Sequence, residues 1–410
     1  MTLLPLAARS LWNRRTTAGL TILSIAISVA LLLSVRQLSE QARAAFASTI
    51  SGTDLIVGAR SGDTNLLLYS VFHLGNATNN VSWPLYERLS KHRQVAWAIP
   101  LSLGDSHRGY RVLGTNDSYY RHYRFGDDRN IEFTAGHAPV DLYDTAIGAE
   151  VARTLGYQLG QHIVIAHGTG STSFAEHADK PFTVAGILAP TGTPIDRTVH
   201  VSLAAIQAIH LNLNVSAQDA RQHDLTPESV TAILIGLKSK IATFQLQRSI
   251  NEYRGEPLLA ILPGVTLQNL WSIVGTVETA LLAVGLLVTV AGLVCLLVAI
   301  LASLNERRRE MAILRSVGAR PIHTFALLIS EAVGVAALGM LLGIVSTYVA
   351  IAVARPIAQH NYGLILRWPA WSLADLILLC GFLLAATLAG AIPAWQAYRR
   401  SLADGLTLRL

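Results

Sequence analysis

The chain has 410 residues, of which 51% are hydrophobic and 14% are charged, and its formal net charge at pH 7 is +6. Both cysteines, Cys295 and Cys380, fall inside long apolar segments, so we expect no disulfide framework. The basic residues flank long apolar segments and form no separate basic patch, so we expect no binding to nucleic acid.

Residues 1–37 are expected to form a cytoplasmic N-terminus and a first transmembrane helix. Their apolar core, residues 16–35, matches the roughly 20 apolar residues that cross a bilayer. The small residues around Phe46 resemble a signal-peptide cleavage site. A signal peptide has an apolar core of only about 7–15 residues, however, so we interpret this segment as a retained anchor.

Residues 38–269 differ in pattern from the spans, and we expect them to form a large extracytoplasmic domain of mixed α+β type. Short β-branched runs broken by turn formers indicate strands, and two apolar runs with helical spacing indicate helices. The expected strands are 161–166, 181–188, 198–202 and 229–236, and the expected helices are 203–211 and 242–253. Residues 38–50 and 241–254 are each expected to continue a helix outward from the membrane.

Three further transmembrane helices are expected in the C-terminal part of the chain. Residues 270–304, 322–354 and 372–410 each contain an apolar segment long enough to span a bilayer, and the last also includes a cytoplasmic tail. Residues 305–321 form a charged connection, and residues 355–371 form a short periplasmic loop. The expected fold class is an integral membrane protein with four transmembrane α-helices and the α+β domain inserted between the first two.

The arginines beside the spans set the expected orientation. They precede the first span, lie between the second and third, and follow the fourth, as in Arg14, Arg15, Arg307, Arg308, Arg309, Arg399 and Arg400. Basic residues close to a span remain on the cytoplasmic side. We therefore expect a protein of the bacterial inner membrane with both termini in the cytoplasm and the inserted domain in the periplasm.

The connection at 305–321 has the pattern of an amphipathic helix. Met311, Leu314 and Gly318 share one face at helical spacing, and charged residues lie opposite. The charged residues of interest are Glu306, Arg307, Arg308, Arg309, Glu310 and Arg315. One interpretation is an ordinary positive-inside loop, and the other is a helix that docks into a cytoplasmic partner.

The third span carries an acidic residue and a small-residue motif. Glu331 lies about ten residues inside this span, where a carboxylate must face protein or water. Gly339 and Gly343 form a small-xxx-small face, which favours close helix packing or dimerisation. We expect Glu331 to make a polar packing contact, with a direct role in transport as the alternative.

The sequence lacks the usual motifs of catalysis. No Gly-Lys pair occurs, so a nucleotide-binding P-loop cannot be written, and neither H-E-x-x-H nor G-x-S-x-G is present. We expect no catalytic residue and no metal site. His162, His167 and His177 lie close in sequence, but their spacing fits no short zinc motif.

The charged connection carries a family resemblance. The run Asn305 to Arg320, followed by Glu331, resembles the permease domain of FtsX-like ABC transporter subunits, and residues 392–400 are similar to the end of that domain. The outer runs 52–59, 70–74 and 191–197 resemble a MacB-like periplasmic core domain. The order of one span, a large domain and three more spans is that of MacB-like (type VII) permeases.

The resemblance implies a non-catalytic permease subunit with defined partners. Such a chain forms a homodimer, or a dimer with a paralogous permease, and works with a separate cytoplasmic ABC ATPase that binds ATP and Mg²⁺; no cofactor is expected in this chain itself. Glu306 to Glu310 and Arg315 would receive the ATPase stroke and pass it to the periplasmic domain. Membrane lipid is an expected partner, and a periplasmic protein or lipoprotein is a further candidate.

Two alternatives remain open from the sequence. One is a signalling scaffold of the FtsX type that regulates a cell-wall hydrolase and transports nothing. The other is a component of metal homeostasis, with zinc as the metal, which depends on the histidine content of the outer domain. The sequence names neither the substrate nor its direction of travel.

Overall fold

The computed structural model describes residues 15–126, 128–168, 180–210, 217–306, 320–362, 368 and 370–399. Its chain contacts divide it into two units. The helical unit comprises the described residues up to Gln41, from Gly275 to Arg355, and from Trp368 onward. The inserted domain comprises residues 42–274 together with residues that follow Arg355.

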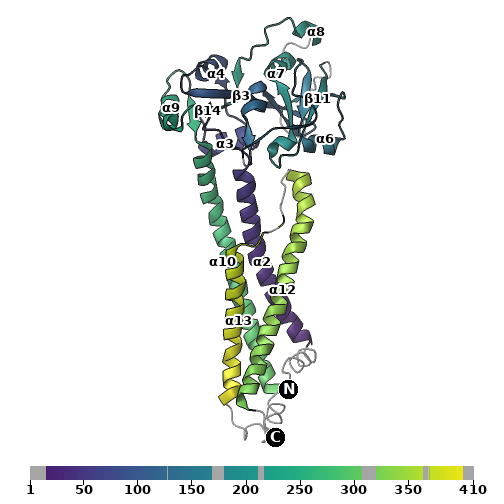
Figure 1. Ribbon diagram of the computed structural model, residues 1–410, viewed down its shortest axis with the longest axis vertical. Helices are drawn as coiled ribbons and strands as arrows, with labels where there is room; N and C mark the ends of the chain where they lie inside the picture. The colour runs from purple at the N-terminus through teal and green to yellow at the C-terminus, as the bar shows by residue number, and fades with distance from the viewer. Residues whose placement is uncertain are drawn as a thin grey trace. The chain divides into compact units, whose positions relative to one another are not determined.

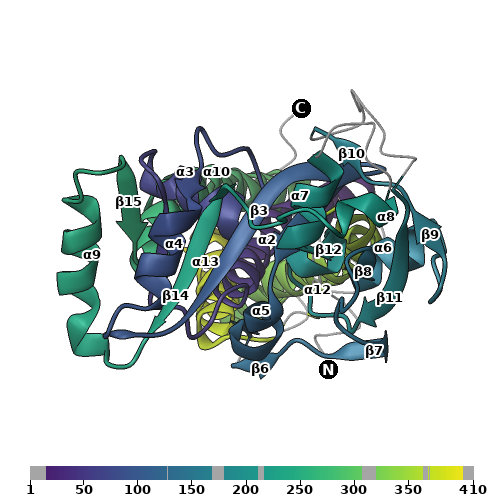
Figure 2. The ribbon, with the colours of Figure 1, turned by 90° about the horizontal axis from the view of Figure 1, so that it is seen from above.

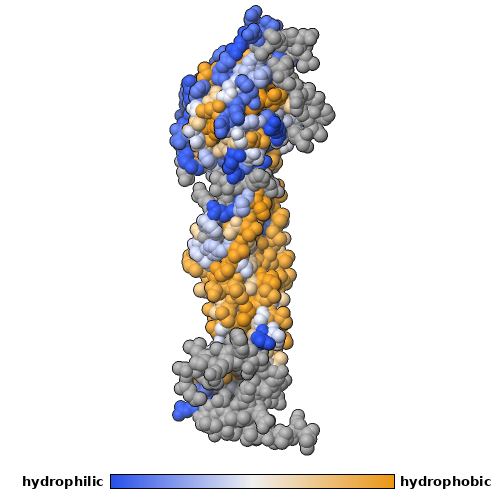
Figure 3. Space-filling view, turned by 90° about the vertical axis from the view of Figure 1, so that its right-hand side faces the viewer, coloured by the Kyte–Doolittle hydropathy of each residue, from blue (hydrophilic) through white to orange (hydrophobic). Residues whose placement is uncertain are grey.

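Four helices in the described part of the chain are long and apolar enough to cross a membrane. They are α2 (Arg15–Ala47), α10 (Pro263–Glu306), α12 (Pro321–Tyr362) and α13 (Leu373–Arg399), shown in Figure 1. Large apolar side chains cover their outer surfaces, which Figure 3 shows in orange. An apolar surface of this kind is stable in hydrocarbon, where helices satisfy their own backbone hydrogen bonds.

The expectation that residues 38–50 continue the first helix outward is confirmed as far as Ala47, where α2 ends. Two other helices are longer than the sequence predicted. Helix α10 begins at Pro263 and not at residue 270, and α12 continues to Tyr362 through a position expected to be a loop. Apolar length marks the part of a helix that suits a bilayer, whereas the helix itself continues as long as helix formers follow. The 44 residues of α10 rise about 66 Å, which exceeds the thickness of a bilayer.

The inserted domain is built on an 11-stranded mixed sheet. The path of strands is β15-β1-β14-β3-β4-β12-β8-β11-β7, with β10 paired to β3 and β9 paired to β11. The strands of this sheet are β1 (Leu55–Ala59), β3 (Val95–His107), β4 (Tyr110–Thr115), β7 (Phe133–Gly136), β8 (Asp144–Ile147), β9 (His162–Ile163), β10 (Ala166–His167), β11 (Phe182–Leu188), β12 (Thr198–Ser202), β14 (Ala232–Leu237) and β15 (Leu258–Ile261). Two small pairs stand apart from it, β2 (Val81–Ser82) with β13 (Ser229–Val230) and β5 (Arg124–Phe125) with β6 (Arg129–Asn130).

Strand β3 is shared by two lobes of this domain. Its first half pairs with β14 and its second half with β4, with a register shift between Leu103 and Ser106. Figure 2 shows β14, α4 (Trp83–Ser90) and α9 (Thr243–Asn251) on one side of β3, and β12, β8 and β11 on the other. The remaining helices are α3 (Asp63–Val71), α5 (Asp117–His122), α6 (Ala149–Leu155), α7 (Leu203–His210) and α8 (Ala217–Ala220), with 3₁₀ turns at Pro194–Arg197 and Lys240–Ala242.

Most of the strand and helix runs expected in this domain occur near their predicted positions. Strands β11 and β12 and helix α7 differ from the expected bounds by one residue or less, while the run 161–166 forms two short strands, β9 and β10. The prediction that residues 241–254 continue a helix outward from the membrane was wrong. Helix α9 ends at Asn251, and β15 joins the sheet before α10 begins.

The ends of α2 and α10 are part of the core of the inserted domain. The ring of Phe46, near the end of α2, lies 4.6 Å from that of Phe72 and 5.5 Å from that of Trp271 in α10. Tyr123 donates a hydrogen bond of 2.6 Å to the carbonyl of Thr49, just after α2. The end of α2 and the start of α10 therefore pack against side chains of the inserted domain.

Candidate functional site

Helix α2 packs against each of the other three helices of the helical unit. Ile25, Val29 and Leu33 recur every four residues and are almost fully buried, so they form one face of α2. On another side, the Ser28 hydroxyl donates a hydrogen bond of 3.1 Å to the carbonyl of Val288 in α10. This central position could not be predicted from the sequence, because the apolar residues of a transmembrane helix do not distinguish protein contacts from lipid contacts.

The small-xxx-small motif of α12 lies against α2 of the same chain. A Cβ atom added to Gly339 would come within 2.5 Å of Ile25, and one added to Gly343 would come within 2.8 Å of Ala26 and Val29. Such close backbone approach is what this motif permits. The face that the sequence left open between packing and dimerisation is therefore occupied within the subunit.

Replacing both glycines with alanine is expected to weaken the packing of α2 on α12. Overpacking of this kind costs roughly 1–3 kcal/mol, although alanine is the better helix former. Gly334→Ala is the matched control on the same helix, because an added Cβ there meets no atom within 4 Å. Thermal unfolding of the full chain in detergent measures the effect; equal midpoints for the two variants would contradict this packing.

Glu331 lies inside the helical unit and not on its lipid-facing surface. Its side chain is 7% exposed, and its neighbours Leu328 and Ala332 belong to the apolar core of this unit. A buried carboxylate at this depth requires polar or charged company. Its role as a packing residue or a transport residue stays a prediction.

The ATPase-coupling residues predicted from the sequence fall at the edge of the described structure. Helix α10 ends at Glu306 and α12 begins at Pro321. Arg307, Arg308, Arg309, Glu310 and Arg315 lie outside the described residues, and the same holds for the side chain of Glu306. Their place between two candidate spans follows from the chain order.

A polar cluster that the sequence reasoning missed joins α2 to α13. Asp375 in the first turn of α13 is fully buried and lies 3.4 Å from the Arg36 Nε. Gln37 donates a hydrogen bond of 3.0 Å to the same carboxylate. The available signal in the sequence was a charged residue at one end of each apolar segment, Arg36 in the first and Asp375 in the last. Each of them alone resembles an ordinary interfacial residue.

In the inserted domain, the turn at 191–197 is organised by Asp196. This carboxylate is 4% exposed and accepts hydrogen bonds of 2.8 Å from the Thr191 amide, the Thr191 hydroxyl and the Gly192 amide. Burial raises the pKa of Asp196, and the two amide donors oppose that rise. The turn that carried part of the family resemblance is therefore a self-contained structural motif.

Asp196→Ala is expected to destabilise the lobe that contains β8, β11 and β12 by roughly 3 kcal/mol, because it leaves buried donors of Thr191 and Gly192 without an acceptor. Hydrogen exchange of β11 and β12 in the full chain measures the loss. Asp224→Ala is the control, since Asp224 caps the Thr226 amide on the exposed surface and its loss should change little. Unchanged protection in Asp196→Ala would refute this role.

Two histidines, the half-buried His73 and the fully buried His200, lie near each other in the same domain. His200 of β12 is fully buried against the rings of Tyr119 and Tyr120, at 5.4 and 6.1 Å between centroids. Among the described residues, neither nitrogen of its ring has a hydrogen-bond partner. The Nδ1 of His73 lies 3.0 Å from the Thr198 hydroxyl oxygen.

Both imidazoles are held neutral. Burial, and then the positive charge of Arg111, lower the pKa of His73 to about 4. Burial, and then the neighbouring His73, lower the pKa of His200 to about 3, while the backbone of Ile195 acts in the opposite direction. These residues can therefore stabilise the fold only while they are uncharged.

The histidines singled out from the sequence are not gathered by the described structure. His162 is exposed in β9, with its Nδ1 3.3 Å from the Thr183 hydroxyl. His167 is described only by its backbone, and His177 lies outside the described residues. In the part of the chain that is described, no three His, Cys, Asp or Glu side chains are close enough to hold a metal ion.

Two family models match the chain. Residues 18–253 match the MacB-like periplasmic core domain, and residues 282–402 match the FtsX-like permease C-terminal model. The first match begins inside α2 and contains most of the inserted domain, and the second contains parts of α10, α12 and α13. No curated protein sequence matches the chain.

Two solved structures are similar to part of the chain. The periplasmic region of MacB from Actinobacillus actinomycetemcomitans is 10% identical, with a TM-score of 0.36, over 54% of this chain and 94% of that one. The extracellular domain of the noncanonic ABC-type transporter YknZ from Gram-positive bacteria is 12% identical, with a TM-score of 0.31, over 51% and 99%.

The family assignment follows from the two models, which match separate parts of the chain. The MacB-like model alone covers more than half of the 410 residues. The FtsX-like model covers the C-terminal helices, and in the described part of the chain one candidate span precedes the inserted domain and three follow it. The chain therefore belongs to the FtsX-like, MacB-like family of ABC transporter permease subunits.

Proposed function

We propose that the chain couples ATP hydrolysis by a separate cytoplasmic ABC ATPase to movement of its inserted domain in the periplasm. The charged connection at 305–321 receives the ATPase, which binds ATP and Mg²⁺, and the subunit acts as a homodimer or with a paralogous permease in the inner membrane. Both termini lie in the cytoplasm, since the arginines that flank the spans gather on that side.

The observation that carries this proposal is the continuity of two helices with the domain core. Helices α2 and α10 each begin or end among buried side chains of the inserted domain, where Phe46 and Trp271 are in contact, and each contains a candidate membrane span. A helix is stiff along its axis, so displacement at one end moves the other end. A flexible linker at these positions would dissipate such a displacement.

The work on the substrate is proposed to take place outside the bilayer. A cavity in the helical unit, lined by residues of α2 and α12 and by Trp371, has a volume of about 10 Å³, enough for about one water molecule. This is far below the roughly 300–1,000 Å³ of a typical ligand site. Export or extraction of a periplasmic or membrane substrate through movement of the inserted domain fits this geometry better than passage between the four helices of one subunit.

Purification of the tagged chain from membranes in mild detergent tests the proposal. Recovery of a stoichiometric Walker-type ATPase, identified by mass spectrometry, supports it, and an additional periplasmic protein or lipoprotein narrows the substrate. Recovery of a cell-wall hydrolase with no transported substrate would favour the signalling scaffold instead. Absence of an ATPase after cross-linking would refute the coupling.

The metal alternative has a separate test. Triple substitution of His162, His167 and His177 with alanine should leave zinc binding by the purified chain unchanged if these residues are ordinary surface histidines. Loss of stoichiometric zinc on this substitution would move the function toward metal homeostasis.

A further inference from the structure

The first turn of α13 holds a carboxylate that its own helix has fixed in place. The Ser372 amide donates a hydrogen bond of 3.1 Å to Asp375 Oδ2, and the Asp375 amide donates one of 3.2 Å to the Ser372 hydroxyl. This reciprocal pair is a capping box, which satisfies two donors at the start of a helix. The charge of Asp375 is nevertheless fully buried, so it needs a counter-charge from elsewhere.

Helix α2 supplies that counter-charge. Arg36 Nε lies 3.4 Å from Asp375 Oδ1, and its Nη2 lies 3.4 Å from the Ser372 hydroxyl. Gln37, which is 6% exposed, donates to Asp375 Oδ2 at 3.0 Å and to the Ala370 carbonyl at 3.4 Å. Two adjacent residues of α2 thus bind both the cap and the preceding backbone of α13. We call this set of contacts the α2–α13 clamp.

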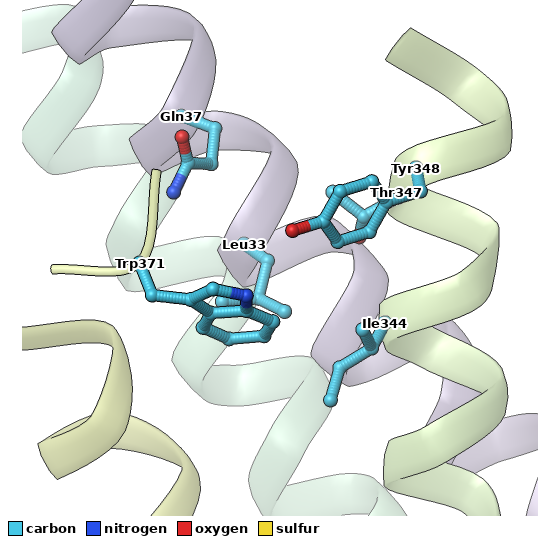
Figure 4. Close-up of a pocket in the computed structure, with 6 residues that line it drawn as sticks. All are labelled: Leu33, Gln37, Ile344, Thr347, Tyr348 and Trp371. Carbon is cyan, nitrogen blue, oxygen red and sulfur yellow. The ribbon is translucent and has the colours of Figure 1, made fainter. Parts of the chain in front are cut away.

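The cavity beside the clamp is too small to make it a ligand site. Its volume is about 10 Å³, and Figure 4 shows Gln37 and Trp371 at its edge with Tyr348 of α12 across from them. One water molecule fills such a space. Asp375 Oδ2 accepts hydrogen bonds from Gln37 and from its own helix, whereas Asp375 Oδ1 has no hydrogen-bond partner among the described residues and lies beside the charge of Arg36. The role of these contacts is to hold two helices together.

The clamp differs in kind from the contact of α2 with α12. At Gly339 and Gly343 that contact is formed by small residues and apolar neighbours. Separating the ion pair of the clamp would leave the fully buried charge of Asp375 uncompensated. Relative motion of α2 and α13 at this point is therefore strongly opposed.

We propose that the α2–α13 clamp makes these two helices one moving body during the transport cycle. Helix α2 continues without a break from Arg36 to Ala47, where it reaches the packed residues of the inserted domain. Helix α13 therefore moves together with α2, although α13 itself belongs to the helical unit and α2 ends in the inserted domain. The joint motion of the two helices rests on the proposed function, because it presupposes a transport cycle. The existence of the clamp does not depend on that function.

A double-mutant cycle on the full chain tests the clamp without any ATPase. Arg36→Met keeps the aliphatic stem, and Asp375→Asn keeps an acceptor for the cap, so each removes one charge. Arg36→Met should lower the thermal midpoint in detergent by roughly 5 °C, because it leaves the fully buried charge of Asp375 unpaired. Asp375→Asn should lower the midpoint by less, because the side chain of Arg36 is 19% exposed and keeps its contact with Glu40. The double variant should recover at least half of the loss seen in Arg36→Met, and strictly additive losses would overturn the clamp.

Glu40→Gln is the matched control for this cycle. Glu40 contacts the same arginine at 3.0 Å, but its side chain is 49% exposed. Its replacement should leave the midpoint unchanged, since exposed ion pairs contribute little to stability. A loss as large as that of Asp375→Asn would show that Arg36 is held by its exposed neighbour and would also overturn the clamp.

Cross-linking tests the motion. Cysteines at Gln37 and Ala370, in a chain with Cys295 and Cys380 replaced by alanine, are joined by a short thiol reagent in the complex with its ATPase. A rate of ATP hydrolysis within about twofold of that of the same variant without the cross-linker supports one moving body. A loss of about tenfold overturns it. If no ATPase accompanies the chain, the proposed function fails while the double-mutant cycle still decides whether the clamp exists.

Discussion

Reversal of Arg307, Arg308 and Arg309 to glutamate is expected to reduce ATP hydrolysis by the permease–ATPase complex by about tenfold or more. These residues follow the end of α10 at Glu306 directly. Three reversed charges at a docking surface place like charges opposite each other, which costs several kcal/mol. ATP turnover of the purified complex and the amount of ATPase retained on the tagged permease are the two measurements.

The same arginines also contribute to membrane orientation, so this experiment needs a topology control. Reversal of Arg14 and Arg15, which precede α2, changes the flanking charge without touching the 305–321 connection. Labelling of an added C-terminal cysteine from each side of the membrane confirms that orientation is kept. Full binding and full turnover in the correctly oriented triple variant would show that the ATPase docks elsewhere.

Acidification from pH 7 to pH 5 is expected to destabilise the inserted domain by about 2 kcal/mol for each of the two histidines with lowered pKa values, His73 and His200. Their pKa values are lowered by folding to about 4 and about 3, below the ordinary 6.5. The stability that depends on their neutral form is therefore fully present above about pH 6.5 and is lost as pH falls toward the folded values. Hydrogen exchange of β4, α5 and β12 in the full chain, corrected for intrinsic exchange rates, measures this loss.

His200→Phe should flatten this pH response by about half. The phenyl ring can keep the contacts with Tyr119 and Tyr120, and no described hydrogen bond of the imidazole ring is lost. The control is His223→Phe, because His223 is exposed and its replacement should leave the pH response unchanged. Equal protection of the wild-type domain at pH 5 and pH 7 would contradict a neutral buried pair.

The elements predicted well are those in which neighbouring residues all favour the same secondary structure. Strand β12 was predicted with its observed bounds, since a short β-branched run between turns has few other solutions. Helix ends were predicted less well, because α10 and α12 extend into polar sequence that apolar length does not mark. The strand β15 was missed because Leu258–Ile261 is too short to separate from the apolar helix that follows.

The residues of the candidate site likewise fall into those that the sequence could identify and those that it could not. Gly339, Gly343 and Glu331 could be singled out because a glycine pair or a carboxylate inside a span is unusual in itself. Arg36 and Asp375 could not be paired, because they are separated by most of the chain and each is ordinary at the end of a span. His73 and His200 could not be paired for the same reason, since the turn after α3 and strand β12 meet only in the folded domain.

By itself, the sequence determined the number and order of the spans, the presence of a large inserted α+β domain and the family, because apolar length, residue alternation and local motifs are properties of contiguous residues. Only the tertiary structure decided that α2 is the central helix, that Gly339 and Gly343 contact it within one subunit, and that a buried ion pair ties α2 to α13. These facts depend on which distant residues meet, and that choice is made by packing and charge compensation across the whole fold.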